Sequence, residues 1–185
     1  YFIHVSSADF NKGNYSLSIN DPLHDYSTFF SFIGALVDNS VGTGTVTLSS
    51  TTNSPFNTFN DNNYQGIQIV SKGNITANNL AASDNGDTGA HLSNQNGLGA
   101  ISVLNSHKTL LGLFNSNTQL GLYAVSKRAI SLRNISADSN GSAGVFINNC
   151  LPSSGICQGL GSVTIKSSNG LVNSFSNNQH YGLWI

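Results

Sequence analysis

Carboxylates are the side chains in this sequence with the clearest capacity for chemistry, and they are scarce. The chain contains eight aspartates and no glutamate, and Asp84 and Asp87 lie close together in the segment SDNGDTG. Hydrolysis of a glycoside requires two carboxyl groups about 5–10 Å apart, and oxygen-rich turns suit calcium. Aspartate is also a common turn residue. We favour the turn interpretation and assign no catalytic residue, with calcium near Asp84 and Asp87 as the alternative.

Histidine and cysteine show no spacing that is typical of a metal site. The five histidines are spread along the chain without a paired ligand, and Cys150 and Cys157 lack the second Cys or His pair that zinc requires. We therefore assign no metal ligands. The two cysteines enclose the segment CLPSSGIC, and we predict that they form a local disulfide in an extracellular protein. Two free thiols in a reducing compartment are the alternative.

The bulk composition excludes several classes of partner. Only 8% of the 185 residues are charged and the formal net charge is −1, so the chain has no basic footprint for nucleic acid. No segment approaches the roughly 20 apolar residues that span a bilayer. The chain begins at Tyr1 without a signal peptide, and we interpret it as a processed piece of an extracellular or cell-surface protein.

Six short segments that begin with glycine recur along the chain. They are GALV at Gly34, GIQI at Gly66, GAHL at Gly89, GLYA at Gly121, GVFI at Gly144 and GLWI at Gly182. The intervals between these glycines are 32, 23, 32, 23 and 38 residues, so long and short repeats alternate. Such self-similarity is typical of a solenoid, in which each coil packs against its neighbours.

A set of triplets, each with Thr or Ser between two apolar residues and called here the apolar triplets, lies between the glycine-led segments. The triplets occupy residues 46–48, 75–77, 101–103, 130–132 and 163–165. Each begins 12, 9, 12, 9 or 19 residues after the preceding glycine, and the last interval contains the cysteine segment. A single insertion of seven residues therefore explains the one interval that departs from the pattern.

Asparagine recurs four residues before the glycine in every repeat except the first, where Phe30 takes its place. The asparagines are Asn62, Asn85, Asn117, Asn140 and Asn178. Because stacked amide side chains can hydrogen-bond to one another and asparagine tolerates left-handed turns, we predict a ladder of asparagines in left-handed turns along the coils. Seven residues before the glycine, the long repeats carry Phe59, Phe114 and Phe175, where the short repeats carry Ala82 and Ala137.

These patterns predict an all-β fold, a right-handed parallel β-helix with alternating long coils of about 32 and short coils of about 23 residues. Alternation over three to five residues indicates strands, and one strand of each type per repeat indicates parallel stacking. Residues 67/69, 90/92, 122/124, 145/147 and 183/185 are expected to point inward. We assign 1–33 to an N-terminal strand and capping segment, and 34–185 to the coils, which we expect to continue beyond the chain end.

The outward positions of the glycine-led strands carry a ring in four consecutive repeats. Read along the stack, these positions are Leu36, Gln68, His91, Tyr123, Phe146 and Trp184. Exposed aromatic side chains on a rigid sheet can stack on sugar rings or pack against another subunit. We therefore predict that His91, Tyr123, Phe146 and Trp184 bind a ligand or partner. The alternative is that another segment covers them.

The repeats resemble the right-handed parallel β-helix of the pectate-lyase-like superfamily. The segments GNITANNLAASDNGDTGAHLSN and RAISLRNISADSNGSAGVFINN are similar to repeats of very large secreted surface proteins of filamentous bacteria, and the resemblance covers 34–185. It implies a surface, adhesive or structural role. Enzymes of this superfamily carry either a calcium-binding acidic cluster with a catalytic arginine or the motifs NTD, DD, GHG and RIK. None of these four strings occurs in this sequence.

Two functions of different class follow. The first is an extracellular structural or adhesive module, a rigid rod that forms or decorates a cell-surface filament or sheath and associates with itself or with further repeats. The second is a domain that binds or cleaves carbohydrate through the outward rings, with a polysaccharide as its ligand. We favour the first, because the motifs specify a fold better than they specify a site.

Overall fold

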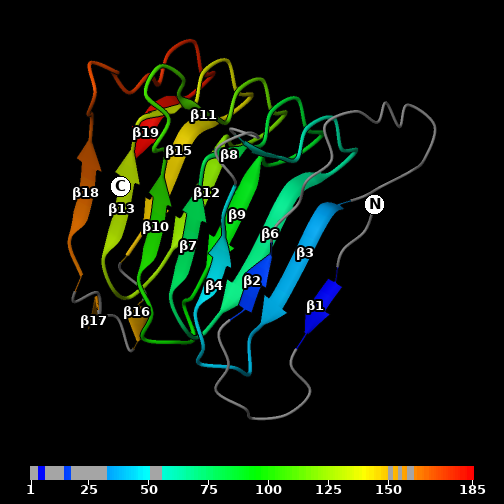
Figure 1. The fold of residues 1–185 in the computed structure, drawn as a ribbon. Helices are drawn as coiled ribbons and strands as arrows, with labels where there is room; N and C mark the ends of the chain where they lie inside the picture. Colours follow the sequence, from blue (N-terminus) through cyan, green and yellow to red (C-terminus); the bar gives the residue numbers. More distant parts are fainter. Residues whose placement is uncertain are drawn as a thin grey trace.

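The structure is a computed structural model that describes residues 4–6, 15–17, 33–50, 56–149, 152–153, 156–157 and 161–185. Within these residues every regular element is a β-strand, and the strands form three parallel sheets and one short antiparallel pair. The first two sheets contain the two sets of strands that the repeats predict (Figure 1). The prediction of an all-β fold of stacked parallel strands is confirmed, and the arrangement is consistent with a parallel β-helix.

The largest sheet has seven strands and contains the glycine-led segments. In spatial order its strands are β1 (His4–Ser6), β3 (Ile33–Asn39), β6 (Gln65–Ser71), β9 (Ala90–Ser93), β12 (Leu122–Val125), β15 (Ala143–Asn148) and β19 (Tyr181–Trp184). Neighbours in space are successive repeats in sequence, with Leu122 in register with Ala90 on one side and Val145 on the other.

The second sheet contains the apolar triplets. Its strands are β2 (Tyr15–Leu17), β4 (Val46–Leu48), β7 (Ile75–Asn78), β10 (Ile101–Leu104), β13 (Ile130–Arg133) and β18 (Val163–Lys166). All of its neighbouring strands are parallel, and Ile101 is in register with Ile75 and Ile130. Residues at the same place in successive triplets thus form a stack of like side chains.

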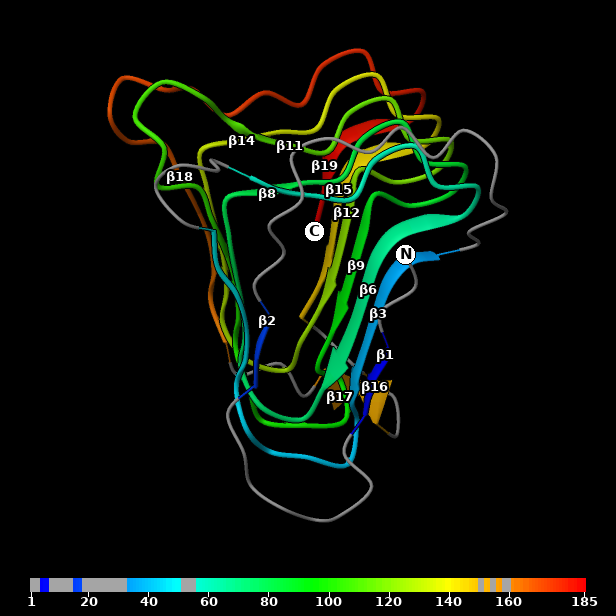
Figure 2. The same cartoon turned by 45° about the vertical axis from the view of Figure 1, so that its right-hand side comes forward.

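The third sheet consists of two-residue strands that the sequence patterns did not reveal. They are β5 (Asn57–Thr58), β8 (Leu80–Ala81), β11 (Gly112–Leu113) and β14 (Ile135–Ser136). Figure 2 shows this sheet across the top, with the largest sheet descending on the right and the second sheet on the left. The remaining strands, β16 (Pro152–Ser153) and β17 (Ile156–Cys157), form the antiparallel pair in the predicted insertion.

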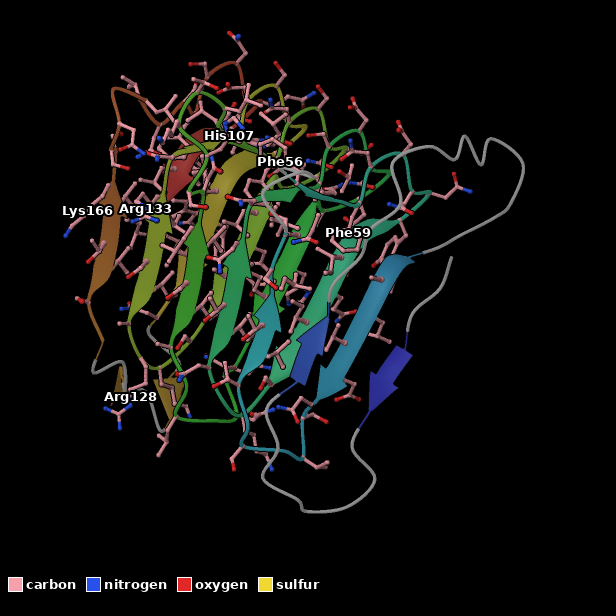
Figure 3. All side chains as sticks on the ribbon, in the orientation of Figure 1. Phe56, Phe59, His107, Arg128, Arg133 and Lys166 are labelled. Atoms are coloured by element: carbon pink, nitrogen blue, oxygen red, sulfur yellow. The ribbon has the colours of Figure 1, made fainter. Side chains whose placement is uncertain are left out.

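The core lies between the three sheets, and strands such as β4, β7, β10 and β13 contribute alternate residues to it. Ile67, Ile69, Ile75 and Ile101 are fully buried. Phe114 from a long repeat is also fully buried, and Phe59, labelled in Figure 3, belongs to the same core. Each buried aliphatic side chain contributes about 1.5–3 kcal/mol before the entropy of ordering it. Stacking therefore stabilises coils that could not bury a core alone.

Residues 183 and 185, which are expected to point inward, are not buried. Leu183 is in register with buried Val145, yet it is 37% exposed, and Ile185 is 64% exposed. The reason is that β19 is an edge strand and no described strand lies beyond it. Val163, Ile165 and Phe175, which belong to the same end of the stack, are only partly buried for the same reason.

Candidate functional site: an aromatic column beside an asparagine ladder

Four rings project from neighbouring strands of the largest sheet and form what we call the aromatic column. His91 lies on β9, Tyr123 on β12, Phe146 on β15 and Trp184 on β19. The parallel register places His91 opposite Tyr123, Tyr123 opposite Phe146, and Phe146 opposite Trp184. His91, Tyr123 and Phe146 alternate with buried core residues in their strands, and Trp184 is in register with Phe146, so the column stands on the outer side of the sheet.

The rings of the aromatic column are in contact from one strand to the next. Ring centroids are separated by 4.8 Å between His91 and Tyr123, 5.1 Å between Tyr123 and Phe146, and 4.7 Å between Phe146 and Trp184. The interplanar angles increase along the column from 43° to 58° and then to 81°. These are tilted and edge-to-face pairs, which are the favourable arrangements for aromatic side chains. The column is therefore one continuous apolar unit.

Exposure increases toward the edge strand. His91, Tyr123 and Phe146 are partly buried, whereas Trp184 is 50% exposed. Tyr181, which directly precedes Gly182, adds a fifth ring. Its centroid lies 5.0 Å from that of Trp184, and the side chain is exposed. The sequence analysis missed Tyr181. Its only signal is that it comes directly before the glycine of the last repeat, in the same strand as Trp184.

The surroundings of His91, at the other end of the column, favour its neutral form. Burial lowers the pKa of His91, and the carboxylate of Asp87 opposes this shift to a smaller extent. A neutral imidazole beside Tyr123 keeps charge out of the ring stack at neutral pH. Beyond His91, the same register continues to Gln68 and Leu36, which carry no ring.

The asparagines predicted to form a ladder are joined by hydrogen bonds through all five repeats. The side-chain amide Nδ2 donates to Oδ1 of the next asparagine at 2.9 Å from Asn62 to Asn85, 2.9 Å from Asn85 to Asn117, 3.1 Å from Asn117 to Asn140 and 3.0 Å from Asn140 to Asn178. The backbone N–H of each donor residue bonds to the same Oδ1.

The ladder also bonds a coil to the backbone of the coil before it. Nδ2 of Asn85 donates to the carbonyl of Phe59, and Nδ2 of Asn117 donates to the carbonyl of Ala82. Asn85, Asn117 and Asn140 are buried. A buried amide with each of its groups bonded stabilises the fold, whereas an unpaired one would cost about 1–3 kcal/mol. The ladder thus fixes the corner that leads into the aromatic column.

The expected left-handed conformation belongs to a different residue. The ladder asparagines have ordinary backbone angles, and the residue before each of them has a positive φ between 57° and 59°. These residues are Asp61, Asp84, Ser116, Ser139 and Asn177. The turn therefore bends one residue earlier than predicted. This leaves the asparagine side chain free to point along the stack instead of serving its own turn.

The two aspartates considered for calcium have other surroundings. Asp84 is one of the left-handed turn residues and is exposed. Partial burial raises the pKa of Asp84, and repulsion from Asp61 adds to this shift. Asp87 accepts a 3.3 Å hydrogen bond from the side chain of Gln65. In the part of the chain that the structure describes, no three His, Cys, Asp or Glu side chains gather into a group that could hold a metal ion.

A second network, which the sequence analysis did not identify, surrounds Asp138. Its carboxylate accepts hydrogen bonds from the hydroxyls of Ser136 and Ser174 at 2.7 and 2.8 Å. Its backbone N–H donates to Asn115, which also accepts from Ser136. These groups come from three successive coils. Asp138 therefore serves as a bridge between coils, and serine and asparagine are too common in the sequence for this to be predicted from spacing.

A further polar column occupies the opposite corner, where the largest sheet leads into the second sheet. Asn39 and Asn94 donate to the carbonyls of Gly44 and Gly99, each five residues ahead. In the repeat between them Ser71 takes the equivalent place and accepts from Asn39 at 2.9 Å. Because asparagine and serine alternate at this position of the repeat, the column does not appear as one recurring residue type in the sequence.

The predicted disulfide between Cys150 and Cys157 lies outside the described residues, because Cys150 and the side chain of Cys157 are not among them. The same holds for most of the predicted capping segment 1–33, of which β1, β2 and the start of β3 are described. No described element is a helix of the length and apolar character needed to cross a membrane.

Comparison with known proteins adds no further assignment. No protein-family model, curated protein or solved structure matches this sequence.

Proposed function

We propose that the chain is a right-handed parallel β-helix with alternating long and short coils, related to the pectate-lyase-like superfamily and to the repeats of large secreted bacterial surface proteins. The separations along the asparagine ladder, 23, 32, 23 and 38 residues, support this coil pattern. In this proposal the molecule is an extracellular structural or adhesive module. It forms, as a rigid rod, part of a cell-surface filament or sheath or decorates its surface.

The aromatic column is the observation that carries the proposal. It runs parallel to the stack across four strands and ends at Trp184, which is half exposed beside Tyr181. Contiguous apolar surface of this kind usually marks an interface. A column that follows the rod axis suits a partner that is itself long and repetitive. Another copy of the chain, or further repeats of the same kind, meets that description.

Rigidity is the second requirement of such a module, and the ladders support it. Buried amides bonded on both sides resist local opening, because each opening would leave several donors and acceptors unpaired. A rod held in this way can transmit force between its partners without losing the register of the column.

Negative-stain electron microscopy and sedimentation velocity of the native protein test the proposal. We expect ordered assemblies that dissociate toward single chains in the variant Trp184→Ala. Val172→Ala is the matched control, since Val172 is an exposed apolar residue at the same end of the chain and outside the aromatic column. Single chains at all concentrations of the wild type, or equal assembly by Trp184→Ala, would contradict the proposal.

Carbohydrate binding is a second candidate, favoured by the same rings. Trp184 and Tyr181 present exposed aromatic surface with a polar N–H and O–H at its margin, which suits the mixed apolar and polar faces of a sugar ring. A polysaccharide, as an extended polymer, would also follow the column.

A glycan array with the wild type, Trp184→Ala and Val172→Ala separates the two candidates. Saccharide binding that is lost only in Trp184→Ala would support the carbohydrate role. No binding across a broad panel would eliminate it and leave self-association as the use of the column.

A further inference from the structure

Four asparagines in this chain are followed directly by glycine: Asn85, Asn96, Asn140 and Asn169. Such pairs are prone to cyclisation. The backbone nitrogen of the glycine attacks Cγ of the asparagine side chain, the bond from Cγ to the amide nitrogen breaks, and ammonia leaves. Water then opens the resulting succinimide at either carbonyl and gives aspartate or isoaspartate. Glycine favours the reaction because it has no side chain to hinder the approach of its nitrogen.

We propose that the asparagine ladder protects Asn85 and Asn140 from this reaction, and that Asn169 and, more slowly, Asn96 are the sites at which the native protein is modified. The four pairs share the same covalent structure. Their surroundings differ in whether the attacking nitrogen and the amide under attack are free to approach each other.

Both reacting groups are held at the two ladder sites. Oδ1 of Asn85 accepts from the backbone and side-chain nitrogens of Asn62, and its Nδ2 donates to Asn117. The attacking nitrogen of Gly86 donates to the carbonyl of Asn62 at 2.8 Å. Cyclisation would require all of these bonds to break around a buried asparagine side chain. The ladder therefore restrains Cγ and the glycine nitrogen together.

The second ladder site repeats this arrangement. Oδ1 of Asn140 accepts from the backbone and side-chain nitrogens of Asn117, its Nδ2 donates to Asn178 at 3.0 Å, and Gly141 N–H donates to the carbonyl of Asn117 at 2.9 Å. The side chains of both Asn85 and Asn140 are at most 2% exposed.

Stacking explains why glycine follows asparagine at these two positions. A Cβ on Gly86 would overlap the carbonyl oxygen of Asn63, and a Cβ on Gly141 would overlap that of Thr118. No larger residue fits where a short coil lies against the long coil before it. The fold thus requires a reactive pair at this corner, and the same corner supplies the bonds that hold it.

The other two pairs lie outside the ladder. Asn169 and Gly170 occupy a turn closed by the bond from Leu171 N–H to the carbonyl of Ser168, both with positive φ, and a Cβ on Gly170 would meet nothing within 4 Å. Asn169 is exposed and no hydrogen bond holds its side chain or Gly170 N–H among the described residues. Neither reacting group is restrained.

Asn96 is intermediate. Its side chain is exposed, but Gly97 N–H donates to the carbonyl of Asn94 at 2.9 Å within a turn. One of the two reacting groups is therefore held by a single bond. The expected order of modification is Asn169, then Asn96, with Asn85 and Asn140 slowest.

Peptide mapping by mass spectrometry, after incubation at mildly alkaline pH, tests this order in the folded wild type and in the same protein unfolded in urea. In the folded protein we expect Asn85 and Asn140 to react at least about tenfold more slowly than Asn169, since several hydrogen bonds must break together. In urea the four rates should become similar. Similar rates in the folded protein, or the same spread of rates in urea, would overturn the proposal.

A variant separates the ladder from burial in general. Asn178→Ala removes the acceptor that binds both nitrogens of Asn140 and leaves the bonds of Asn85 to Asn62 and Asn117 intact. We expect the reaction at Asn140 to accelerate severalfold while Asn85 stays unchanged as an internal reference. Gln179→Ala, at an exposed neighbouring position, is the control. An unchanged rate at Asn140 in Asn178→Ala would overturn the protective role of the ladder.

Discussion

Asn117 occupies the middle of the asparagine ladder and shows what a single polar side chain contributes to this fold. Its Oδ1 accepts from the backbone and side-chain nitrogens of Asn85, and its Nδ2 donates to Asn140 and to the carbonyl of Ala82. Four hydrogen bonds from one buried amide join three coils. The stability of the corner therefore depends on individual residues as well as on the stack.

We predict that Asn117→Ala lowers the free energy of unfolding by about 3 kcal/mol, because it leaves partners on both neighbouring coils unpaired in a buried corner. Urea unfolding followed by circular dichroism measures the change. Asn96→Ala, at an exposed position, should change stability by no more than about 0.5 kcal/mol. Equal effects of the two substitutions would show that the ladder adds nothing specific.

His91 predicts a pH dependence of stability with a defined sign. Burial lowers the pKa of His91 in the folded chain, so below the usual histidine pKa of about 6.5 the unfolded chain binds more protons than the folded one. Stability is then unaffected by His91 above that pH and is lost as the pH falls below it. Urea midpoints of the wild type and His91→Gln, compared between pH 8 and pH 5, test this.

The expected outcome is a smaller loss of stability on acidification in His91→Gln than in the wild type. Both proteins share every other titrating group, which makes the difference specific to His91. If acid destabilises the two proteins equally, burial in the aromatic column does not lower the pKa of His91.

At the scale of the strand, the glycine before each aromatic position sets how closely the coils approach. A Cβ on Gly121 would lie 2.5 Å from the carbonyl oxygens of both Gly144 and Phe114. Such a distance is too short for any real contact, so a side chain there would force β12 away from β15. The recurring glycine is therefore a requirement of stacking as well as a marker of the repeat.

Gly121→Ala should destabilise the fold by about 2–3 kcal/mol, as expected for overpacking against backbone that cannot move aside. Gly112→Ala is the matched control, because a Cβ on Gly112 in β11 would have its nearest neighbour at 3.1 Å and needs a smaller adjustment. Thermal or urea unfolding distinguishes them. A cost for Gly112→Ala as large as for Gly121→Ala would mean that both effects come from the loss of glycine flexibility.

The strands of the first two sheets recur at the same place in each repeat and could be predicted from the sequence. The strands of the third sheet could not. The register between Leu122, Ala90 and Val145 follows from the glycine-led segments, since residues at the same place in each repeat become neighbours in a stack. The two-residue strands of the third sheet are too short to produce an alternating pattern. Where these short strands form depends on the longer strands that precede and follow them in each coil.

The candidate site divides in the same way. The order of the rings from His91 to Trp184 could be predicted from the sequence, because residues at the same outward place in successive repeats become neighbours in the sheet. The tilt of the rings, the contribution of Tyr181 and the network of Asp138 depend on side-chain packing between coils. The left-handed turn was misplaced by one residue, since both Asp61 and Asn62 belong to residue types that favour turns.

At the scale of the molecule, local stability should differ from coil to coil along the stack and should be similar in the three sheets of one coil. Among the described strands, β9 and β12 have a partner on both sides, whereas β18 and β19 have one on a single side. In a solenoid each coil is stabilised by its neighbours, so coils with two neighbours open least. The stack is best regarded as a series of coupled layers.

Hydrogen exchange with mass spectrometry should therefore show the slowest exchange in β9, β10, β12 and β13, and progressively faster exchange in β18 and β19. The three sheets of a given coil should exchange at similar rates, because their strands pack around one shared core. A division by sheet, with all strands of one sheet protected and those of another exchanging fast, would contradict the layered description.

The antiparallel pair β16 and β17 has a practical consequence. It sits between β15 and β18 in the chain, yet Ile130 still pairs with Val163 and Val145 still pairs with Leu183 on either side of it. The stack thus accommodates an extra segment in one coil without a shift of register in the next. The same position offers a place to graft a foreign epitope or a binding loop, which an array of such rods would then display at regular spacing.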